Sequence, residues 1–169
     1  MAAQRGTVDR VLRSALPLSL VMSPVLSAQD APAAFAALSG DWVGEGSMFS
    51  RPARFTMRWR AQGGFAVLEF TNGFVDSLGE VTPALRSAAV YRTDPARPEG
   101  VWLDSRGVRI ELMWEASDST LVVNWAAPTE SGRTTYRADA TGEVHVVDEV
   151  RSGGTWRTFA MAAYRRRAP

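Results

Sequence analysis

The chain contains no cysteine and no lysine, and its only histidine is His145. Without cysteine there is no disulfide and no thiolate nucleophile, and we expect no lipoprotein anchor. A hydrolase needs a nucleophile, a base and an orienting acid, and a zinc site needs several nitrogen or sulfur ligands. A single histidine meets these requirements poorly, so we expect neither an enzyme nor a metal site.

An excess of charge of one sign is also missing. All 19 basic residues are arginine, and the chain has 18 acidic residues, so its formal net charge is +1. Nucleic acids and anionic membranes are bound through a concentrated positive field, which a balanced mixture does not create. We therefore expect no nucleic-acid partner. The planar guanidinium suits pairing across strands and stacking on aromatic rings.

No apolar run is long enough to span a bilayer as a helix, which takes roughly 20 residues. The first residues nevertheless have a recognisable order: three arginines, the apolar residues 15–22 and the small residue Ala28. This order is typical of a secretory signal peptide. We therefore predict a signal peptide over residues 1–28, one domain over residues 29–169, a periplasmic or secreted location and no stable membrane anchor. The alternative is a disordered or interfacial N-terminal arm.

From Gly40 to Arg167 the sequence alternates apolar and polar residues about ten times, with Gly, Asn, Asp or Pro between the runs. In residues 54–60, Phe55, Met57 and Trp59 share one face, and arginine and threonine share the other. Period-two alternation of this kind indicates half-buried strands. We predict an all-β, ten-stranded, antiparallel up-and-down barrel.

The expected strands are residues 41–49, 54–60, 65–71, 84–92, 101–105, 108–116, 120–126, 133–140, 143–151 and 155–166. A break is expected at residues 72–73, followed by an irregular segment over residues 74–83. One short helix is expected before the strands, over residues 30–38, with Asp30 as its cap. Phe35 and Leu38 would lie together on this helix and plug one mouth of the barrel. Gly44 and Gly46 on the first strand indicate a bend or a close backbone approach.

The opening segment GDWVGEG, residues 40–46, is similar to the first strand of calycin-type barrels, the lipocalin and fatty-acid-binding superfamily. Segments 60–65, 101–105 and 164–166, together with Tyr91, resemble a bacterial family of lipocalin-like domains without assigned activity, distantly related to the nitrobindins. The resemblance covers about residues 35–167. It implies that Trp42 lies at the closed end of the barrel, covered by Arg165 or Arg166 from the last strand.

The nitrobindin resemblance further implies haem, held by a histidine on a strand near the C-terminus. Here residues 158–164 contain no histidine, and His145 belongs to the preceding strand. Met161 could ligate iron, but a lone thioether more often fills core volume. We therefore expect no cofactor and keep haem as the lesser alternative.

The predicted inner face is rich in bulky apolar side chains, and ten strands enclose more volume than eight, which already hold a small ligand in lipocalins. The residues that we predict to line a ligand cavity are Trp42, Met48, Phe55, Met57, Trp59, Leu112, Trp114, Trp125, Tyr136, Phe159 and Met161. These residues suggest an exported binding protein, a carrier or sensor of a small apolar or amphipathic molecule. Its ligand and its oligomeric state stay open.

Two other functions are consistent with the same residues. A barrel filled by its own side chains would be a structural or interaction module. An enzyme would use His145 with Glu143 or Glu149, which share its strand face, whereas Asp148 points the other way. We favour a half-exposed position for His145 on the outer face. Arg54, Arg58 and Arg60 are also expected outside, because burying unpaired guanidinium groups is costly.

Overall fold

The computed structural model describes residues 31–168, so the predicted signal peptide and Asp30 lie outside the described residues. The helix is α1 (Ala33–Leu38). The strands are β1 (Gly40–Met48), β2 (Arg51–Gln62), β3 (Phe65–Val75), β4 (Val81–Arg92), β5 (Glu99–Asp104), β6 (Arg109–Ala116), β7 (Thr120–Ala126), β8 (Ser131–Ala138), β9 (Val144–Ser152) and β10 (Thr155–Arg166).

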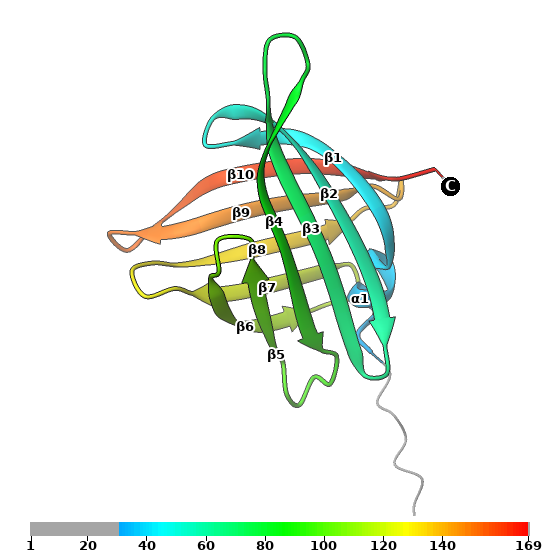
Figure 1. Cartoon of the computed structure of the whole chain (residues 1–169). Helices are drawn as coiled ribbons and strands as arrows, with labels where there is room; N and C mark the ends of the chain where they lie inside the picture. The colour runs from blue at the N-terminus through cyan, green and yellow to red at the C-terminus, as the bar shows by residue number, and fades with distance from the viewer. Residues whose placement is uncertain (1–30, 169) are drawn as a thin grey trace, which may run out of the picture.

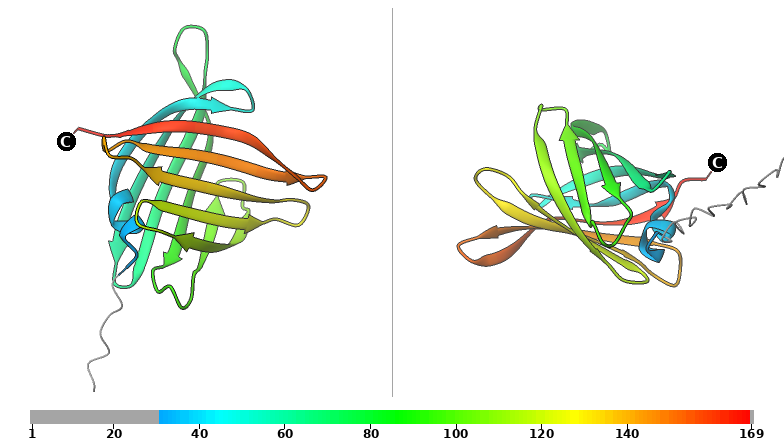
Figure 2. Two further views of the ribbon diagram at one scale, coloured as in Figure 1. Left: turned by 180° about the vertical axis from the view of Figure 1, so that it is seen from behind. Right: turned by 90° about the horizontal axis from the view of Figure 1, so that it is seen from below.

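Each strand pairs antiparallel with its neighbours in sequence, and β1 also pairs with β10, which closes the sheet into a barrel (Figures 1 and 2). The predicted all-β barrel is thus confirmed. The alternation gives each strand one apolar face, and the closed sheet buries these faces in a shared interior. On β2, Phe55, Met57 and Trp59 are buried, with at most 2% of each side chain exposed.

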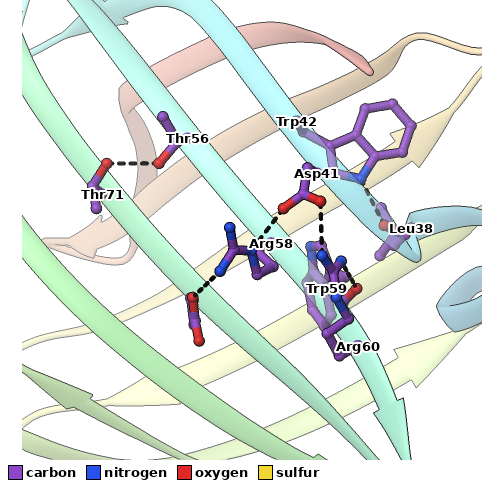
Figure 3. A network of polar contacts seen from close by, with 9 residues as sticks. Leu38, Asp41, Trp42, Thr56, Arg58, Trp59, Arg60 and Thr71 are labelled. Atoms are coloured by element: carbon purple, nitrogen blue, oxygen red, sulfur yellow. Dashed lines mark hydrogen bonds and ion pairs between the residues drawn. The ribbon is translucent and has the colours of Figure 1, made fainter. Parts of the chain in front are cut away.

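The outer face of the same strands carries the charged residues. Arg58 and Arg60 of β2 each donate a 2.7 Å hydrogen bond to the Asp41 carboxylate of β1 (Figure 3). Arg54 pairs with Glu45 in the same way at 3.3 Å. The hydrogen bonds from Arg58 and Arg60 hold the pKa of the Asp41 carboxyl below its usual value. The outward placement of the three arginines is confirmed, and their partners are carboxylates on the neighbouring strand.

The segment between the third and fourth strands is more regular than expected. Strand β3 runs through Asn72 and Gly73 to Val75, and the ladder with β4 continues across a bulge at this point. Gly73 pairs with Pro83, which a sheet tolerates at such an irregularity. The expected break at residues 72–73 was therefore wrong. Figures 1 and 2 show the resulting β3–β4 hairpin projecting beyond the barrel.

Helix α1 covers one end of the barrel, which we call the closed end. Its N-cap is Pro32, without a side-chain cap. Phe35 packs against Trp59, Tyr91 and Trp114, with ring centroids 5.1 to 6.2 Å apart. The predicted plug is thus confirmed. No helix in the described part of the chain is both long and apolar enough to cross a membrane.

Trp42 also lies at the closed end. Its indole N–H donates a 2.7 Å hydrogen bond to the carbonyl of Leu38 (Figure 3). The guanidinium of Arg166 lies 4.5 Å from the centre of the Trp42 ring and donates a 2.8 Å hydrogen bond to the Ser39 carbonyl. The expected pairing of Trp42 with an arginine of the last strand is confirmed, with Arg166 as the partner.

Both glycines of β1 allow a close approach of β10. A Cβ atom at Gly44 would lie 2.6 Å from the Tyr164 ring, and one at Gly46 would overlap the backbone of Met161. Any other residue would push β10 away from β1. The expected close approach is confirmed at both positions.

Candidate binding cavity

A cavity of about 560 Å³ occupies the barrel towards the end opposite α1. Its walls come from the ends of the strands joined by the β1–β2, β3–β4, β5–β6, β7–β8 and β9–β10 turns. The bulky apolar residues of the wall include Met48, Phe55, Phe70, Phe74, Leu85, Trp102, Ile110, Leu112, Val123, Trp125, Val146 and Phe159. We call this end of the barrel the mouth.

Strand β9 carries a carboxylate into the cavity. Its inward positions alternate as Val144, Val146 and Asp148, and the two valines are buried. In the sheet, Asp148 lies between Thr134 of β8 and Ala160 of β10. The Thr134 hydroxyl donates a 2.6 Å hydrogen bond to Oδ1 of Asp148. Among the described residues, no hydrogen bond or ion pair reaches Oδ2.

The environment of Asp148 disfavours its charged form. Burial raises its pKa to about 6, although the hydrogen bond from Thr134 acts in the opposite direction. Burial also raises the pKa of Tyr91 and Tyr136, which line the cavity, and the negative charge of Asp148 raises both further. At neutral pH the cavity therefore holds a carboxylate beside neutral phenols.

Two further charged side chains line the cavity near its mouth, Arg106 and Glu130. The Arg106 guanidinium binds the Asp104 carboxylate of the same turn at 2.6 Å. Glu130 belongs to the loop between β7 and β8. The cavity lining thus carries the carboxylates of Asp148 and Glu130 and the guanidinium of Arg106. The guanidinium already has a partner in Asp104, a residue outside the lining.

The β1–β2 turn forms another part of the mouth. Phe49 is 63% exposed and lines the cavity, so the cavity reaches the surface here. Phe49 and Ser50 have φ angles of 50° and 62°, a left-handed conformation that is costly for residues other than glycine, asparagine and aspartate. Phe49 stacks on Phe159 at 5.5 Å and donates its backbone N–H to the Phe159 carbonyl.

The predicted cavity residues fall into three groups. Six line the cavity: Met48, Phe55, Leu112, Trp125, Tyr136 and Phe159. Four are buried outside its lining, as part of the packed core: Trp42, Met57, Trp59 and Trp114. Met161 is the exception, because it is 51% exposed and lies on the outer face.

The inward placement of Met161 was wrong because β10 contains a bulge. The ladder between β9 and β10 shifts between Thr158 and Ala160, which leaves Phe159 as an extra residue. An extra residue reverses the alternation beyond it. Phe159 and Ala160 therefore both line the cavity, and Met161 points to solvent.

The polar residues of the cavity, above all Asp148 and Thr134, were not predicted from the sequence. The pattern of β9 contains the signal for Asp148, because this residue continues the inward series of Val144 and Val146. A carboxylate in such a series is a candidate for function. No comparable signal exists for Thr134, since its role depends on the register of β8 against β9.

His145 lies on the outer face, as expected, with 49% of its side chain exposed. Its Nε2 atom is 3.0 Å from Oδ2 of Asp139, a partner that we did not expect. With Glu143 these residues place three potential metal-ligand atoms within 4.8 Å of one another. None of them lines the cavity. The structure therefore separates the histidine from the enclosed space where a substrate would be held.

The lining residues do not fit haem. They include no histidine, and Met161 points away from the cavity. The sulfur of Met48 accepts a hydrogen bond from Asn72 at 3.4 Å, and burial keeps the phenols of Tyr91 and Tyr136 protonated. No lining group is thus an evident axial ligand.

The fold and the cavity together define a closed ten-stranded β-barrel with a partly apolar interior space. No protein-family model matches the chain, and no curated protein matches its sequence. Among solved structures, the crystal structure of Rv2717c from M. tuberculosis is similar, with a TM-score of 0.60 and 18% sequence identity. The match covers 82% of this chain and 99% of that chain. At this identity the likeness shows a shared barrel fold.

Proposed function

We propose that the protein binds one small, mainly apolar or amphipathic molecule inside the barrel and acts as its carrier or sensor. The observation that carries this proposal is the cavity of about 560 Å³ with aromatic walls. Ligand pockets have volumes of roughly 300 to 1,000 Å³ and are mostly apolar, with a few polar groups that orient the ligand. The resemblance of the sequence to calycins supports the same function.

The alternative, a barrel filled by its own side chains, describes only one end of the molecule. At the closed end, Trp59 stacks on Tyr91 at 5.3 Å and meets Tyr136 edge to face at 5.5 Å. The mouth has aromatic residues of similar size but no α1 to insert a side chain between them. This difference favours a binding protein over a purely structural one.

The binding proposal is tested with two variants of neighbouring residues on β10. Ala160 is 3% exposed and lines the cavity, whereas Met161 is 51% exposed on the outer face. Ala160→Phe adds a ring to the cavity, and Met161→Phe adds it to the surface. The neutral fluorescent lipophile N-phenyl-1-naphthylamine is titrated into each protein, and its emission is recorded together with that of tryptophan.

We expect the wild-type protein and Met161→Phe to bind the lipophile equally, and Ala160→Phe to bind at least about tenfold more weakly, because its ring occupies ligand volume. Val123→Phe, in the cavity wall on β7, provides a second filled cavity if Ala160→Phe does not fold. The proposal fails if the wild type binds no lipophile, or if both filled variants bind as the wild type does.

We further propose that residues 1–28 direct export, so that the carrier works in the periplasm or outside the cell. Mass spectrometry of the protein from its native envelope tests this proposal, since it should give an N-terminus after Ala28. The same sample, extracted with organic solvent, would identify any molecule that the barrel retains. Its absorbance spectrum should show no Soret band.

A further inference from the structure

We infer that the ligand is an organic cation, whose protonated amine pairs with the Asp148 carboxylate while its apolar part fills the aromatic cavity. This inference rests on the proposed function and names the chemistry of the ligand. Three observations carry it: an unpaired carboxylate, the other charges of the lining and the nature of the walls.

The first observation is the lack of a basic partner for Asp148. Thr134 satisfies Oδ1 at 2.6 Å, and among residues 31–168 no arginine forms an ion pair with either oxygen. Its neighbour Glu149, on the outer face, pairs with Arg133 at 2.6 Å. Asp148 is half-buried, and a carboxylate that loses part of its hydration without gaining a cation is disfavoured. Because Asp148 faces the cavity, a ligand is the group that can supply the cation.

The second observation is the charge of the lining. It carries Asp148, Glu130 and Arg106, and Arg106 already binds Asp104. A cation that enters at the mouth therefore moves towards an unpaired negative group. A fatty acid would place a second carboxylate beside Asp148, and two like charges in a partly buried cavity repel each other.

The third observation is the abundance of aromatic rings in the walls. Phe70, Trp102, Trp125 and Phe159 come from four different strands and contribute ring surface around the same space. The face of an aromatic ring attracts a cation electrostatically, and the attraction is stronger where water is excluded. Such walls suit both parts of an amphipathic amine, its charged head and its apolar body.

The charged head would also lie close to the tyrosines of the inner face. The negative charge of Asp148 acts on three tyrosines, Tyr91 of β4, Tyr136 of β8 and Tyr164 of β10. Tyr136 lines the cavity and also contacts Trp59 of the packed closed end. The Asp148 carboxylate thus lies among these phenols, and the apolar part of the ligand would fill the rest of the cavity towards the mouth.

The test compares three probes of equal chain length, octylamine, octanol and octanoate, by isothermal titration at pH 7.5. We expect the amine to bind at least about tenfold more tightly than the alcohol, and the acid to bind most weakly. Asp148→Asn keeps the shape and removes the charge. It should weaken amine binding by about tenfold or more, leave alcohol binding within about twofold, and strengthen acid binding.

The matched control is Glu149→Gln, which removes a carboxylate from the adjacent residue on the outer face. It should leave the affinity for all three probes unchanged. A second control is Glu130→Gln at the mouth, which should weaken amine binding far less than Asp148→Asn does. The two controls together separate a specific pair with Asp148 from a general effect of negative charge.

The pH dependence provides a further readout. Asp148 is protonated as the pH falls through about 6, and amine affinity should fall about tenfold between pH 7.5 and pH 5. The phenols of Tyr91, Tyr136 and Tyr164 stay neutral over this range, because their pKa is raised. Glu130 and Arg106 face the cavity from the mouth, and Glu130→Gln should keep the pH dependence. Octanol binding should not depend on pH, and amine binding by the Asp148→Asn variant should not depend on it either.

The outcomes distinguish this inference from the proposed function. If the amine and the alcohol bind equally well, or if the amine preference survives Asp148→Asn, the inference is wrong and the cavity is simply apolar. If neither the three probes nor N-phenyl-1-naphthylamine binds at all, the proposed function itself fails.

Discussion

At the closed end of the barrel, Phe35 of α1 inserts between Trp59, Tyr91 and Trp114 and fills the space that the strands enclose. At the mouth, aromatic residues of the same strands surround a cavity of about 560 Å³. The alternation that builds the walls is the same at both ends. The ends differ because the short helix α1 contributes a side chain to the closed end and none to the mouth. A barrel of ten strands is wide, and the side chains of its own strands leave space that another group can fill.

Each end also has a polar atom without a partner, and the strained backbone lies at the mouth. At the closed end, the Trp42 and Trp114 indoles donate hydrogen bonds of 2.7 and 2.9 Å to backbone carbonyls, although the Trp59 Nε1 has no partner among the described residues. At the mouth, Asp148 keeps one oxygen free and the left-handed Phe49 adds backbone strain. Unpaired and strained groups cost stability, and proteins retain them where they serve function.

The largest expected effect comes from truncating one tryptophan at each end. Trp59→Ala removes a ring that is 1% exposed and packs on Phe35, Tyr91 and Tyr136, so it should lower the free energy of unfolding by about 3 to 5 kcal/mol. Trp125→Ala, at the partly exposed cavity wall, should cost less than about 2 kcal/mol. Urea unfolding measures both values. Equal losses would mean that the two ends are packed equally well.

Asp148→Asn should stabilise the protein at pH 8 by up to about 3 kcal/mol and leave it nearly unchanged at pH 4. The pKa of Asp148 is raised from 3.8 to about 6, so the native state holds this proton more tightly than the unfolded state does. The wild type therefore loses stability as the pH rises from about 4 to about 6. Glu149→Gln serves as the control. A lower stability of Asp148→Asn at pH 8 would show that the carboxylate is favourably paired.

At the closed end, Arg166→Ala should lower the free energy of unfolding by about 0.5 to 1 kcal/mol, because it removes the guanidinium over Trp42. Arg165→Ala is the matched control, since Arg165 is 83% exposed and pairs only with Glu143 in the described structure. Thermal unfolding followed by circular dichroism distinguishes the two. If Arg166→Ala melts at the same temperature as the wild type, the contact of Arg166 with the Trp42 ring does not stabilise the protein.

The smallest effect is expected at the strained turn of the mouth. Ser50→Gly should raise the free energy of unfolding by about 0.5 to 1 kcal/mol, because glycine adopts the left-handed φ of 62° without steric cost. Ser47→Gly, within β1, should instead destabilise the protein. If Ser50→Gly is neutral or destabilising, the turn stores no strain.

Much of the fold can be predicted from local pattern alone. Strand β2 shows why: Phe55, Met57 and Trp59 alternate with arginines, and only an extended chain places three bulky residues on one side. The plug of α1 and the pairing of Trp42 with an arginine of β10 were also predicted. The expected break at residues 72–73 was wrong because a bulge lets the hairpin continue across Gly73 and Pro83.

The sequence by itself determined that this chain forms a closed barrel with an apolar interior, because alternation is a property of neighbouring residues along one strand. Only the tertiary structure decided what that interior offers a ligand. The register of β8, β9 and β10 brings Thr134, Asp148 and Ala160 side by side, and the bulge at Phe159 turns Met161 outward. Register and bulges depend on pairing between distant segments, which no single strand encodes.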